Sequence, residues 1–485
     1  MLDREKYNIE REKALRNQVL ELSEYLNQFI KSRENVRDRE INNMPTEEVL
    51  EKIRNIPIQN KGRNAKEVSD ELVHTILDNS ATIKHPRFFS FVVGDVSPYS
   101  LAGTILSDIY NQNACSYQLS PASATVEEKL ISWAGERAGF DTEKCGGIFT
   151  SGGSVSNLTG MIAARECKLP GRYDLPNAVA FCSTQTHSSI RKGMRLMGLR
   201  NDQIVQIEVD EDYKIRTDLL KAAIEKAVND NKKPFLIVGS LGTTNTGSID
   251  PIDELADIAQ KYGMWLHIDG AYGGSILVSD IYKNLAKGID RADSFSWDFH
   301  KWMLQVYSCS CVVVKNKTDL INAFAEHPEY LEDVINSEHV DGWDLGIEMS
   351  RPARYIKLWY TLQVMGTDLF SDIVDYAFFN AKTATRRITE YKDWEVVSKP
   401  MCGTVNIRYA PKWVDSKWHD ELNSRISSAI IESGYAYIVT TVLNGKKCMR
   451  LCMINGSTET VDVISTVDKL NEIAQEIAKS EEYKN

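Results

Sequence analysis

The sequence lacks the features of a secreted, membrane-spanning or nucleic-acid-binding protein. No apolar run approaches the roughly 20 residues needed to cross a bilayer, and the charged N-terminus has no apolar signal core. Nine cysteines form no C-x-x-C pair, so we expect reduced thiols in a cytoplasmic protein. The 57 basic residues are outnumbered by 68 acidic ones, and the net charge of −11 disfavours a nucleic-acid or membrane partner.

The composition is that of a globular protein with more than one domain. Hydrophobic residues make up 42% and charged residues 26% of the 485-residue chain, which exceeds one ordinary hydrophobic core. Residues 1–83 carry apolar positions at helical spacing and predict a helical segment that packs on a partner subunit. We predict a large domain over residues 84–375 and a small α/β domain over residues 376–485.

Short apolar runs alternate with helical segments between residues 145 and 315, which predicts a mostly parallel sheet covered by helices. In open α/β sheets, ligands bind at the carboxyl ends of the strands, so the polar residues that follow the runs are the candidate site. The expected strands are Gly147–Thr150, Ala178–Cys182, Gln203–Ile207, Phe235–Ser240, Trp265–Ile268, Ser294–Trp297 and Cys309–Val314.

Lys301 lies in an unusual segment, S-F-S-W-D-F-H-K-W (294–302), between two runs that we expect to be buried. Lysine is rarely buried without a partner. Burial would lower its pKa and make it an amine nucleophile, for example toward an aldehyde cofactor. The alternative is a lysine that extends from the edge of the core to solvent.

The segment I-F-T-S-G-G-S-V-S-N (148–157) predicts a strand, a Gly-Gly turn and the start of a helix. Glycines allow close approach, and the helix N-terminus offers free N–H groups, which favours an anion such as phosphate. The segment fits neither G-x-x-x-x-G-K-[ST] nor G-x-G-x-x-G, which disfavours a nucleotide. A serine-capped tight turn is the alternative.

Three further polar positions follow expected strands. His187 could stack on a flat cofactor or be an ordinary loop residue, and Thr244 lies in a Gly/Thr-rich turn. Asp269 ends an apolar strand, where it either caps a turn or pairs with a cation such as a pyridinium. A phosphate site, a ring stacker, an aspartate and a lysine are the set that pyridoxal 5′-phosphate requires.

These segments resemble the group II pyridoxal-phosphate decarboxylases, in particular the aromatic L-amino acid decarboxylase branch with the bacterial tryptophan decarboxylases. The resemblance covers about residues 60 to 480. It implies fold type I, with an aspartate aminotransferase-like sheet, and a homodimer whose active site lies at the subunit interface. The remaining motifs that carry it are H-P-R-F-F-S-F (85–91), Q-T-H-S-S (185–189), G-T-T-N-T-G-S-I-D (242–250), H-I-D-G-A-Y-G-G (267–274) and R-P-A-R-Y-I-K-L-W (351–359).

The resemblance also implies individual roles. Lys301 would bind the cofactor aldehyde, Asp269 would pair with the pyridine nitrogen, and His187 would stack on the ring. Asp298 stands where relatives commonly carry asparagine; since a carboxylate repels phosphate, we expect it to point elsewhere or to be protonated. The other residues expected at the cofactor are Gly153, Ser154, Thr244 and His300, with Ser350 contributed by the partner subunit.

The implied reaction converts an aromatic L-amino acid to an arylalkylamine and carbon dioxide through an external aldimine and a quinonoid. Tryptophan, which yields tryptamine, is the first expected substrate, with phenylalanine or tyrosine next. The positions that match the substrate pocket are Phe91, Asn113, Leu119 and Trp343. Tryptophan-specific relatives carry histidine at the position of Asn113, and no basic residue in this set suits glutamate. No metal is expected.

The proton donor and the outcome of the reaction stay open. Many relatives use a loop tyrosine, but residues 339–342 contain none, which leaves Tyr330 and His339 as candidates. Relatives without this tyrosine can be aromatic acetaldehyde synthases, so oxidative decarboxylation is the alternative function. A non-catalytic sheet protein that binds a phosphorylated ligand is a third hypothesis.

Overall fold

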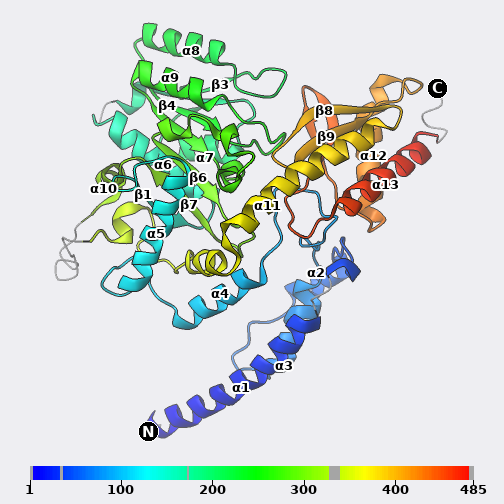
Figure 1. Cartoon of the computed structure of the whole chain (residues 1–485). Coiled ribbons are helices and arrows are strands. Elements are labelled where there is room, and N and C mark those ends of the chain that lie inside the picture. The colour runs from blue at the N-terminus through cyan, green and yellow to red at the C-terminus, as the bar shows by residue number, and fades with distance from the viewer. Residues whose placement is uncertain (1–3, 33–35, 172–173, 327–338, 480–485) are drawn as a thin grey trace.

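A seven-stranded sheet forms the centre of the computed structural model, which describes residues 4–32, 36–171, 174–326 and 339–479 (Figure 1). Its strand order is β1-β7-β6-β5-β4-β2-β3. Strand β7 pairs antiparallel with both neighbours, and the other pairs are parallel. The strands are β1 (Gly146–Thr150), β2 (Ala178–Ser183), β3 (Ile204–Ile207), β4 (Lys233–Ser240), β5 (Trp265–Asp269), β6 (Ser294–Asp298) and β7 (Ser310–Val314).

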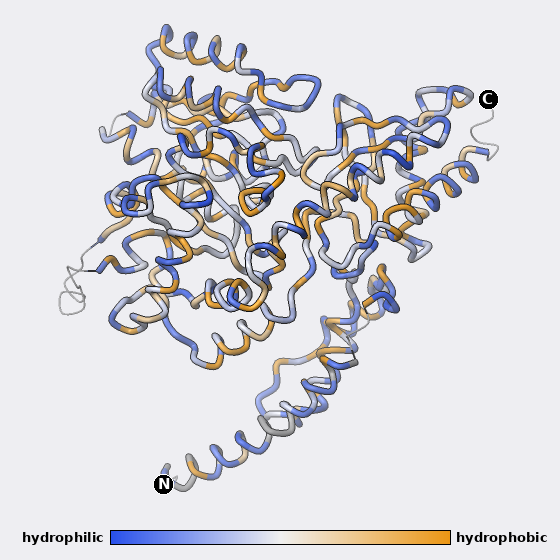
Figure 2. Tube along the Cα trace, in the orientation of Figure 1, coloured by the Kyte–Doolittle hydropathy of each residue, from blue (hydrophilic) through white to orange (hydrophobic). Residues whose placement is uncertain are grey.

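Both faces of this sheet are buried. Alternate side chains of one strand enter two different hydrophobic cores, as Ile148 and Phe149 of β1 show. Apolar residues on both faces are typical of a sheet covered by helices, and the expected mostly parallel fold is confirmed. In Figure 2, orange hydrophobic segments recur throughout the body, and the outer helices alternate between orange and blue. The surrounding helices are α5 (Pro121–Arg137), α6 (Gly153–Lys168), α7 (Ser188–Leu196), α8 (Thr217–Asn229), α9 (Ile252–Tyr262) and α10 (Lys317–Phe324).

A second, four-stranded antiparallel sheet lies in the C-terminal part, in the order β10-β11-β9-β8. Its strands are β8 (Trp394–Met401), β9 (Thr404–Tyr409), β10 (Thr440–Leu443) and β11 (Lys446–Cys452), packed with α12 (His419–Glu432) and α13 (Thr460–Ala478). Helix α11 (Ile356–Thr389), interrupted at Gly366, connects the two sheets (Figure 1). It runs through the expected division at residues 375 and 376, which stays a prediction. Strand β8 was not expected.

The N-terminal part extends away from both sheets (Figure 1). It consists of α1 (Arg4–Ser32), α2 (Glu47–Arg54), α3 (Ala65–Glu71) and a π-helix, η2 (Leu72–Leu77). Helix α4 (Pro98–Tyr110) follows. Short 3₁₀ helices are η1 (Val36–Asp38), η3 (Leu175–Asn177), η4 (Asn201–Gln203), η5 (Gly273–Val278), η6 (Lys283–Ala286), η7 (Ile289–Arg291), η9 (Gly342–Leu345) and η10 (Ser416–Trp418).

Helix α11 begins at Ile356, and Pro352 keeps Arg351 outside it, because a proline disfavours the helical conformation for the residue before it. Within the described residues, none of the helices is both long and apolar enough to traverse a bilayer.

Candidate active site

A cavity of about 250 Å³ lies at the carboxyl ends of the parallel strands, the edge at which open α/β sheets bind their ligands. It is lined from β4, β5 and β6 and from the loops that follow β1, β2 and β6. Seven of the expected site residues line it: Gly153, Ser154, His187, Thr244, Asp269, His300 and Lys301. Their roles stay predictions, but the fold brings together residues that lie between positions 153 and 301 of the sequence.

The Gly-Gly turn presents backbone, not side chains, to this cavity. A Cβ on Gly153 would lie 2.8 Å from both Ala271 Cβ and Asp298 Oδ2, closer than real side chains pack. The nearest atom to a Cβ on Gly152 would be His300 Cε1 at 3.9 Å, an ordinary contact. Helix α6 begins at Gly153, so the free backbone N–H groups of its first turn are available for an anion.

Lys301 forms an ion pair with Asp298, 2.8 Å between Nζ and Oδ2, and its side chain is 22% exposed. Burial acts to lower the pKa of Lys301, but the charge and hydrogen bond of Asp298 outweigh it and raise the pKa. The expectation of a lowered lysine pKa was therefore wrong. Asp298 is almost completely buried against Gly153, so it does not point away from the turn.

His300 lies on the other side of Asp298, 3.6 Å between Nε2 and Oδ2. Burial lowers the pKa of His300, and the charge of Asp298 opposes that effect without reversing it. The backbone N–H of Cys309 donates to Nδ1 at 3.2 Å, which orients the ring. His300 is thus held as a neutral imidazole beside a carboxylate.

Asp269 ends β5 between two serines, Ser240 of β4 and Ser296 of β6. Its Oδ1 accepts hydrogen bonds from Ala271 N at 3.2 Å and from Ser296 Oγ at 3.4 Å. Ser240 Oγ is buried and has no hydrogen-bond partner among the described residues. The Asp269 carboxylate and the Ser240 hydroxyl group therefore both retain hydrogen-bonding capacity toward the cavity.

Two histidines, His187 at the start of α7 and His267 on β5, differ in their surroundings. His187 caps α7: its Nδ1 accepts from Ser189 N at 3.3 Å and lies 2.8 Å from Ser189 Oγ, which fixes the ring at the edge of the cavity. His267 is fully buried between Ser294 and Asn157, and burial lowers its pKa to about 4. His187 can meet a ligand, whereas His267 is part of the core.

The small sheet holds one wall of the cavity. Arg450 donates to the carbonyl of Thr244 at 2.8 Å, and Asn406 donates to the carbonyl of Asn245 at 2.9 Å. The hydroxyl of Tyr272, which lines the cavity, lies 2.9 Å from Thr404 Oγ1. The turn after β4 is therefore positioned by residues far later in the chain.

The expected substrate residues do not line this cavity. Phe91 is 54% exposed, and Leu119 is 66% exposed. Asn113 accepts hydrogen bonds from the backbone N–H groups of Cys115 and Arg351, at 3.1 and 3.4 Å. Trp343 is buried elsewhere and Ser350 is exposed outside the cavity, while Tyr330 lies outside the described residues.

Phe91 nevertheless belongs to a segment that flanks the site. A Cβ on Gly94 would collide with the carbonyl oxygen of Lys301, so this backbone passes directly against the lysine. His339 stacks on Tyr117, with ring centroids 3.8 Å apart, away from the cavity lining. A proton-donating role for His339 at this chain's own cavity is therefore not supported.

Tyr307 lines the cavity and was missed by sequence reasoning. Its ring centroid is 4.5 Å from that of His300, and the residue is 52% exposed. Burial raises the pKa of Tyr307, and the charge of Lys301 opposes that effect. The sequence did contain an indication of this position. Strand β7 (Ser310–Val314) pairs antiparallel with β6, so the segment between the two strands, which contains Tyr307, returns to Lys301.

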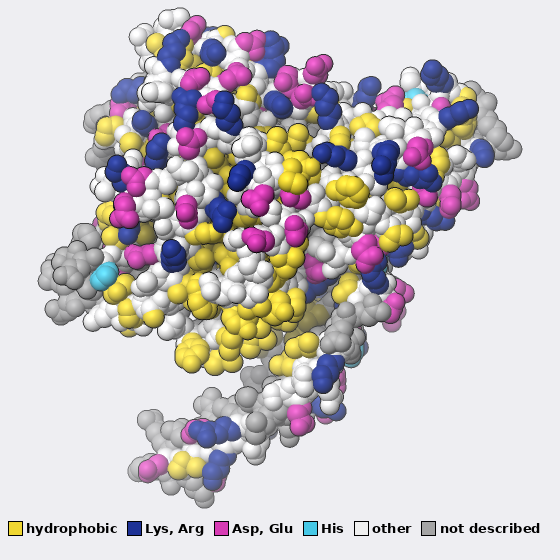
Figure 3. Space-filling view, in the orientation of Figure 1, with side chains coloured by type: hydrophobic (Ala, Val, Ile, Leu, Met, Phe, Trp, Pro, Cys, Tyr) yellow, Lys and Arg dark blue, Asp and Glu magenta, His cyan; other side chains and the backbone are white. Residues whose placement is uncertain are grey.

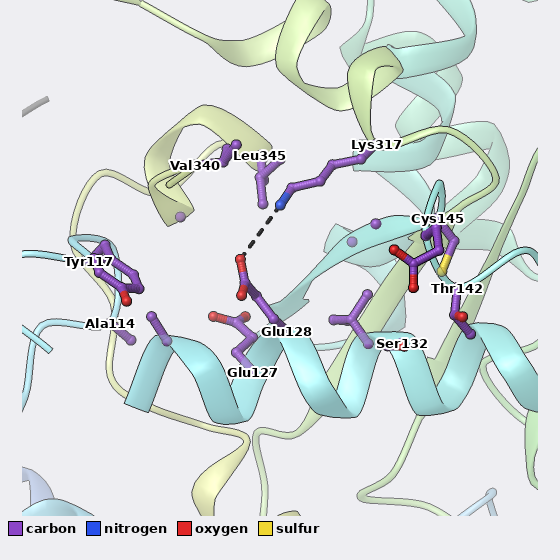
Figure 4. Close-up of a pocket in the computed structure, with 16 residues that line it drawn as sticks. Ala114, Tyr117, Glu127, Glu128, Ser132, Thr142, Cys145, Lys317, Val340 and Leu345 are labelled. Atoms are coloured by element: carbon purple, nitrogen blue, oxygen red, sulfur yellow. Dashed lines mark ion pairs between the residues drawn. The ribbon is translucent and has the colours of Figure 1, made fainter. Parts of the chain in front are cut away.

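A second hollow lies beside α5 (Figure 4). Two of its acidic groups have partners: Glu128 pairs with Lys317 at 3.5 Å, and Glu127 forms a buried ion pair with Arg351. Glu127 also accepts from the backbone N–H of Phe149 at 2.8 Å. None of the expected site residues lines this hollow, so it is not the candidate site.

The cavity at the sheet edge fits pyridoxal 5′-phosphate. It offers an amine for the aldehyde, a carboxylate for the ring nitrogen, a flat ring for stacking and a glycine turn at a helix N-terminus. Residues 48–410 match the family described as the pyridoxal-dependent decarboxylase conserved domain. The chain therefore belongs to the pyridoxal-dependent decarboxylases, and it is a carbon–carbon lyase with pyridoxal 5′-phosphate as cofactor.

Within this family, the sequence is 33% identical to an aromatic-L-amino-acid decarboxylase of Bacillus atrophaeus over 87% of this chain and 88% of that protein. It is 28% identical to a human cysteine sulfinic acid decarboxylase over 78% of each chain. Catharanthus roseus tryptophan decarboxylase, solved with L-tryptophan, superposes with a TM-score of 0.86 at 25% identity, over 96% of this chain and 98% of that one. The expected family and fold are confirmed.

Proposed function

We propose that this enzyme decarboxylates an aromatic L-amino acid, tryptophan first and phenylalanine or tyrosine next, to the arylalkylamine. The observation that carries the proposal is the charge of the cavity: among the described residues that line it, Lys301 is the only lysine or arginine. With that lysine engaged by the cofactor, the described lining of the cavity has no lysine or arginine left to bind an acidic side chain. This favours an apolar substrate over cysteine sulfinate, and the similarity to the Bacillus atrophaeus enzyme supports it.

Four residues would prepare the reaction. Pyridoxal 5′-phosphate, when bound, holds the substrate through its aldehyde carbon and accepts the electrons released as carbon dioxide leaves. Lys301 would hold the cofactor between turnovers and would be the amine that substrate replaces. Asp269 would keep a proton on the ring nitrogen, which would strengthen the electron demand of the ring. His187 would cover one face of the ring, and Ser154 would contribute to the anion site at the start of α6.

Tyr307 is the proton donor that we favour among the described residues. Tyr307 lines the cavity, whereas His339 stacks on Tyr117. A phenol at this place can donate a proton to Cα after carbon dioxide has left and recover one from solvent. The Tyr330 candidate lies outside the described residues.

We also propose a homodimer in which the substrate residues meet the site across the subunit interface. An apolar surface lies along α4 (Figure 3). The N-terminal helices α1 and α3 extend beside it (Figure 1). The exposed residues of the apolar surface include Leu101, Ile105, Leu106, Ile109 and Tyr110. A patch of this kind marks a protein interface. Phe91, Asn113, Leu119, Trp343 and Ser350 would then act at the cavity of the partner subunit or at its entrance.

The test is product analysis with purified protein. L-tryptophan, L-phenylalanine, L-tyrosine, L-glutamate and cysteine sulfinate are each supplied, and amine and carbon dioxide are quantified. We expect one mole of amine for each mole of carbon dioxide from the aromatic substrates only. Turnover of an acidic substrate, with none of the aromatic ones, would refute the proposal.

Oxidative decarboxylation is the second candidate. The observation that favours it is the lack of a tyrosine at residues 339–342, where many relatives carry their proton donor. The reaction would consume the amino acid, dioxygen and water, and release aldehyde, carbon dioxide, ammonia and hydrogen peroxide in equal amounts. Peroxide equal to the carbon dioxide formed would establish this function, and stoichiometric amine would exclude it.

A further inference from the structure

The carboxylate of Asp298 lies against the glycine turn that we expect to hold the cofactor phosphate. Its Oδ2 lies against Gly153, at the first residue of α6, and pairs with Lys301 Nζ at 2.8 Å. Its Oδ1 is buried without a hydrogen-bond partner among the described residues. A buried carboxylate oxygen without a donor is costly, so this atom has an open position for a hydrogen bond from a ligand.

The surrounding groups cannot neutralise both a carboxylate and a phosphate dianion. Among the described residues that line the cavity, Lys301 provides the sole lysine or arginine charge. His300, on the other side of Asp298, is held neutral because burial lowers its pKa. The start of α6 contributes only a partial positive charge. At most one positive charge and one helix terminus therefore face the three negative charges of Asp298 and the phosphate dianion at neutral pH, since the second pKa of a phosphate monoester is about 6.

We propose that this site takes up one proton when it binds pyridoxal 5′-phosphate, and that Asp298 and the phosphate share that proton. The proton comes from solvent and remains between the carboxyl and phosphate oxygens, so the buried pair carries one negative charge fewer. Asp298 is then a hydrogen-bond donor to the phosphate instead of a repelling charge. This proposal concerns cofactor binding alone and does not depend on which amino acid is the substrate.

None of the other titratable groups described around Asp298 accounts for this proton uptake. Lys301 and His300 belong to the same segment, and Tyr307, Cys309 and Cys311 lie on or near β7. Asp269 and His187 line the same cavity. Burial raises the pKa of both cysteine thiols and of Tyr307, so these groups stay neutral between pH 7 and 9.

The test is a competition in the holoenzyme between pyridoxal 5′-phosphate and pyridoxal, which lacks the phosphate. The purified holoenzyme is equilibrated with excess pyridoxal at pH 7, 8 and 9, and the released phosphate form is quantified. If binding of the phosphate form takes up one proton more, its advantage over pyridoxal falls roughly tenfold per pH unit. A preference that is constant from pH 7 to 9 overturns the proposal, and this comparison needs no variant.

The Asp298→Asn variant locates the proton. It removes the charge and keeps the shape, so we expect a preference for the phosphate form that no longer depends on pH and exceeds that of wild type about tenfold or more at pH 9. The Glu128→Gln variant, on an exposed pair outside the cavity, controls for net charge and should match wild type. An Asn variant with the pH dependence of wild type would assign the proton to another group and refute the role of Asp298.

Discussion

The two adjacent glycines of the anion turn allow a matched test of the cofactor site. In Gly153→Ala, the new methyl group would lie 2.8 Å from Ala271 Cβ and from Asp298 Oδ2, inside the ordinary contact distance of about 3.5 Å. Excess volume in a packed site costs about 1–3 kcal/mol. Because relief of the clash displaces the turn that must hold the phosphate, we expect cofactor affinity to fall by roughly 5- to 150-fold.

Gly152→Ala is the control. Its methyl group would meet no atom closer than His300 Cε1 at 3.9 Å, and Gly152 has an extended backbone that alanine also adopts. Cofactor affinity is measured by titration of each variant, with the visible absorbance of the bound cofactor as the signal. Equal affinities for Gly153→Ala and wild type, or equal losses in the two variants, would refute the close approach of phosphate to Gly153.

Four further outcomes are expected. Lys301→Ala should lose both the visible absorbance of the linked cofactor and all amine formation; retained turnover would contradict its role. Tyr307→Phe should form less amine and a larger fraction of peroxide from the same substrate, and an unchanged ratio would remove Tyr307 as the proton donor. Asn113→His should shift the ratio of kcat/KM toward tryptophan over phenylalanine. Glu127→Gln should lose about 3–5 kcal/mol of unfolding free energy in urea, because it leaves Arg351 buried and unpaired, whereas Glu128→Gln should change little.

The large sheet was predictable because its strands are apolar on both faces and end in polar residues. Strand β8 was not, since its sequence W-E-V-V-S-K-P-M includes a lysine and a proline. Such residues are tolerated because β8 lies at the edge of the small sheet, where a strand lacks a second neighbour. Edge strands therefore carry a weak sequence signal, even where they complete a sheet.

The residues at the site were easier to predict than their electrostatics. The sequence indicated that Lys301 lies between buried strands, and burial alone predicts a lowered pKa. The opposite result depends on Asp298, whose carboxylate reaches the amine only because β6 ends at that residue. Tyr307 reaches the cavity through the antiparallel return of the chain into β7, which local sequence patterns do not specify.

The contacts between the small sheet and the turn after β4 set a lower limit on the functional fragment. Every described residue that lines the cavity precedes position 310, and the family match ends at residue 410. Arg450, which holds the carbonyl of Thr244, lies beyond both limits. A truncated chain that ends at residue 410 would contain every described residue that lines the cavity, yet it would lack the hydrogen bond from Arg450 that positions the turn after β4. Conserved-domain boundaries are therefore a poor guide for designing a minimal version of this enzyme.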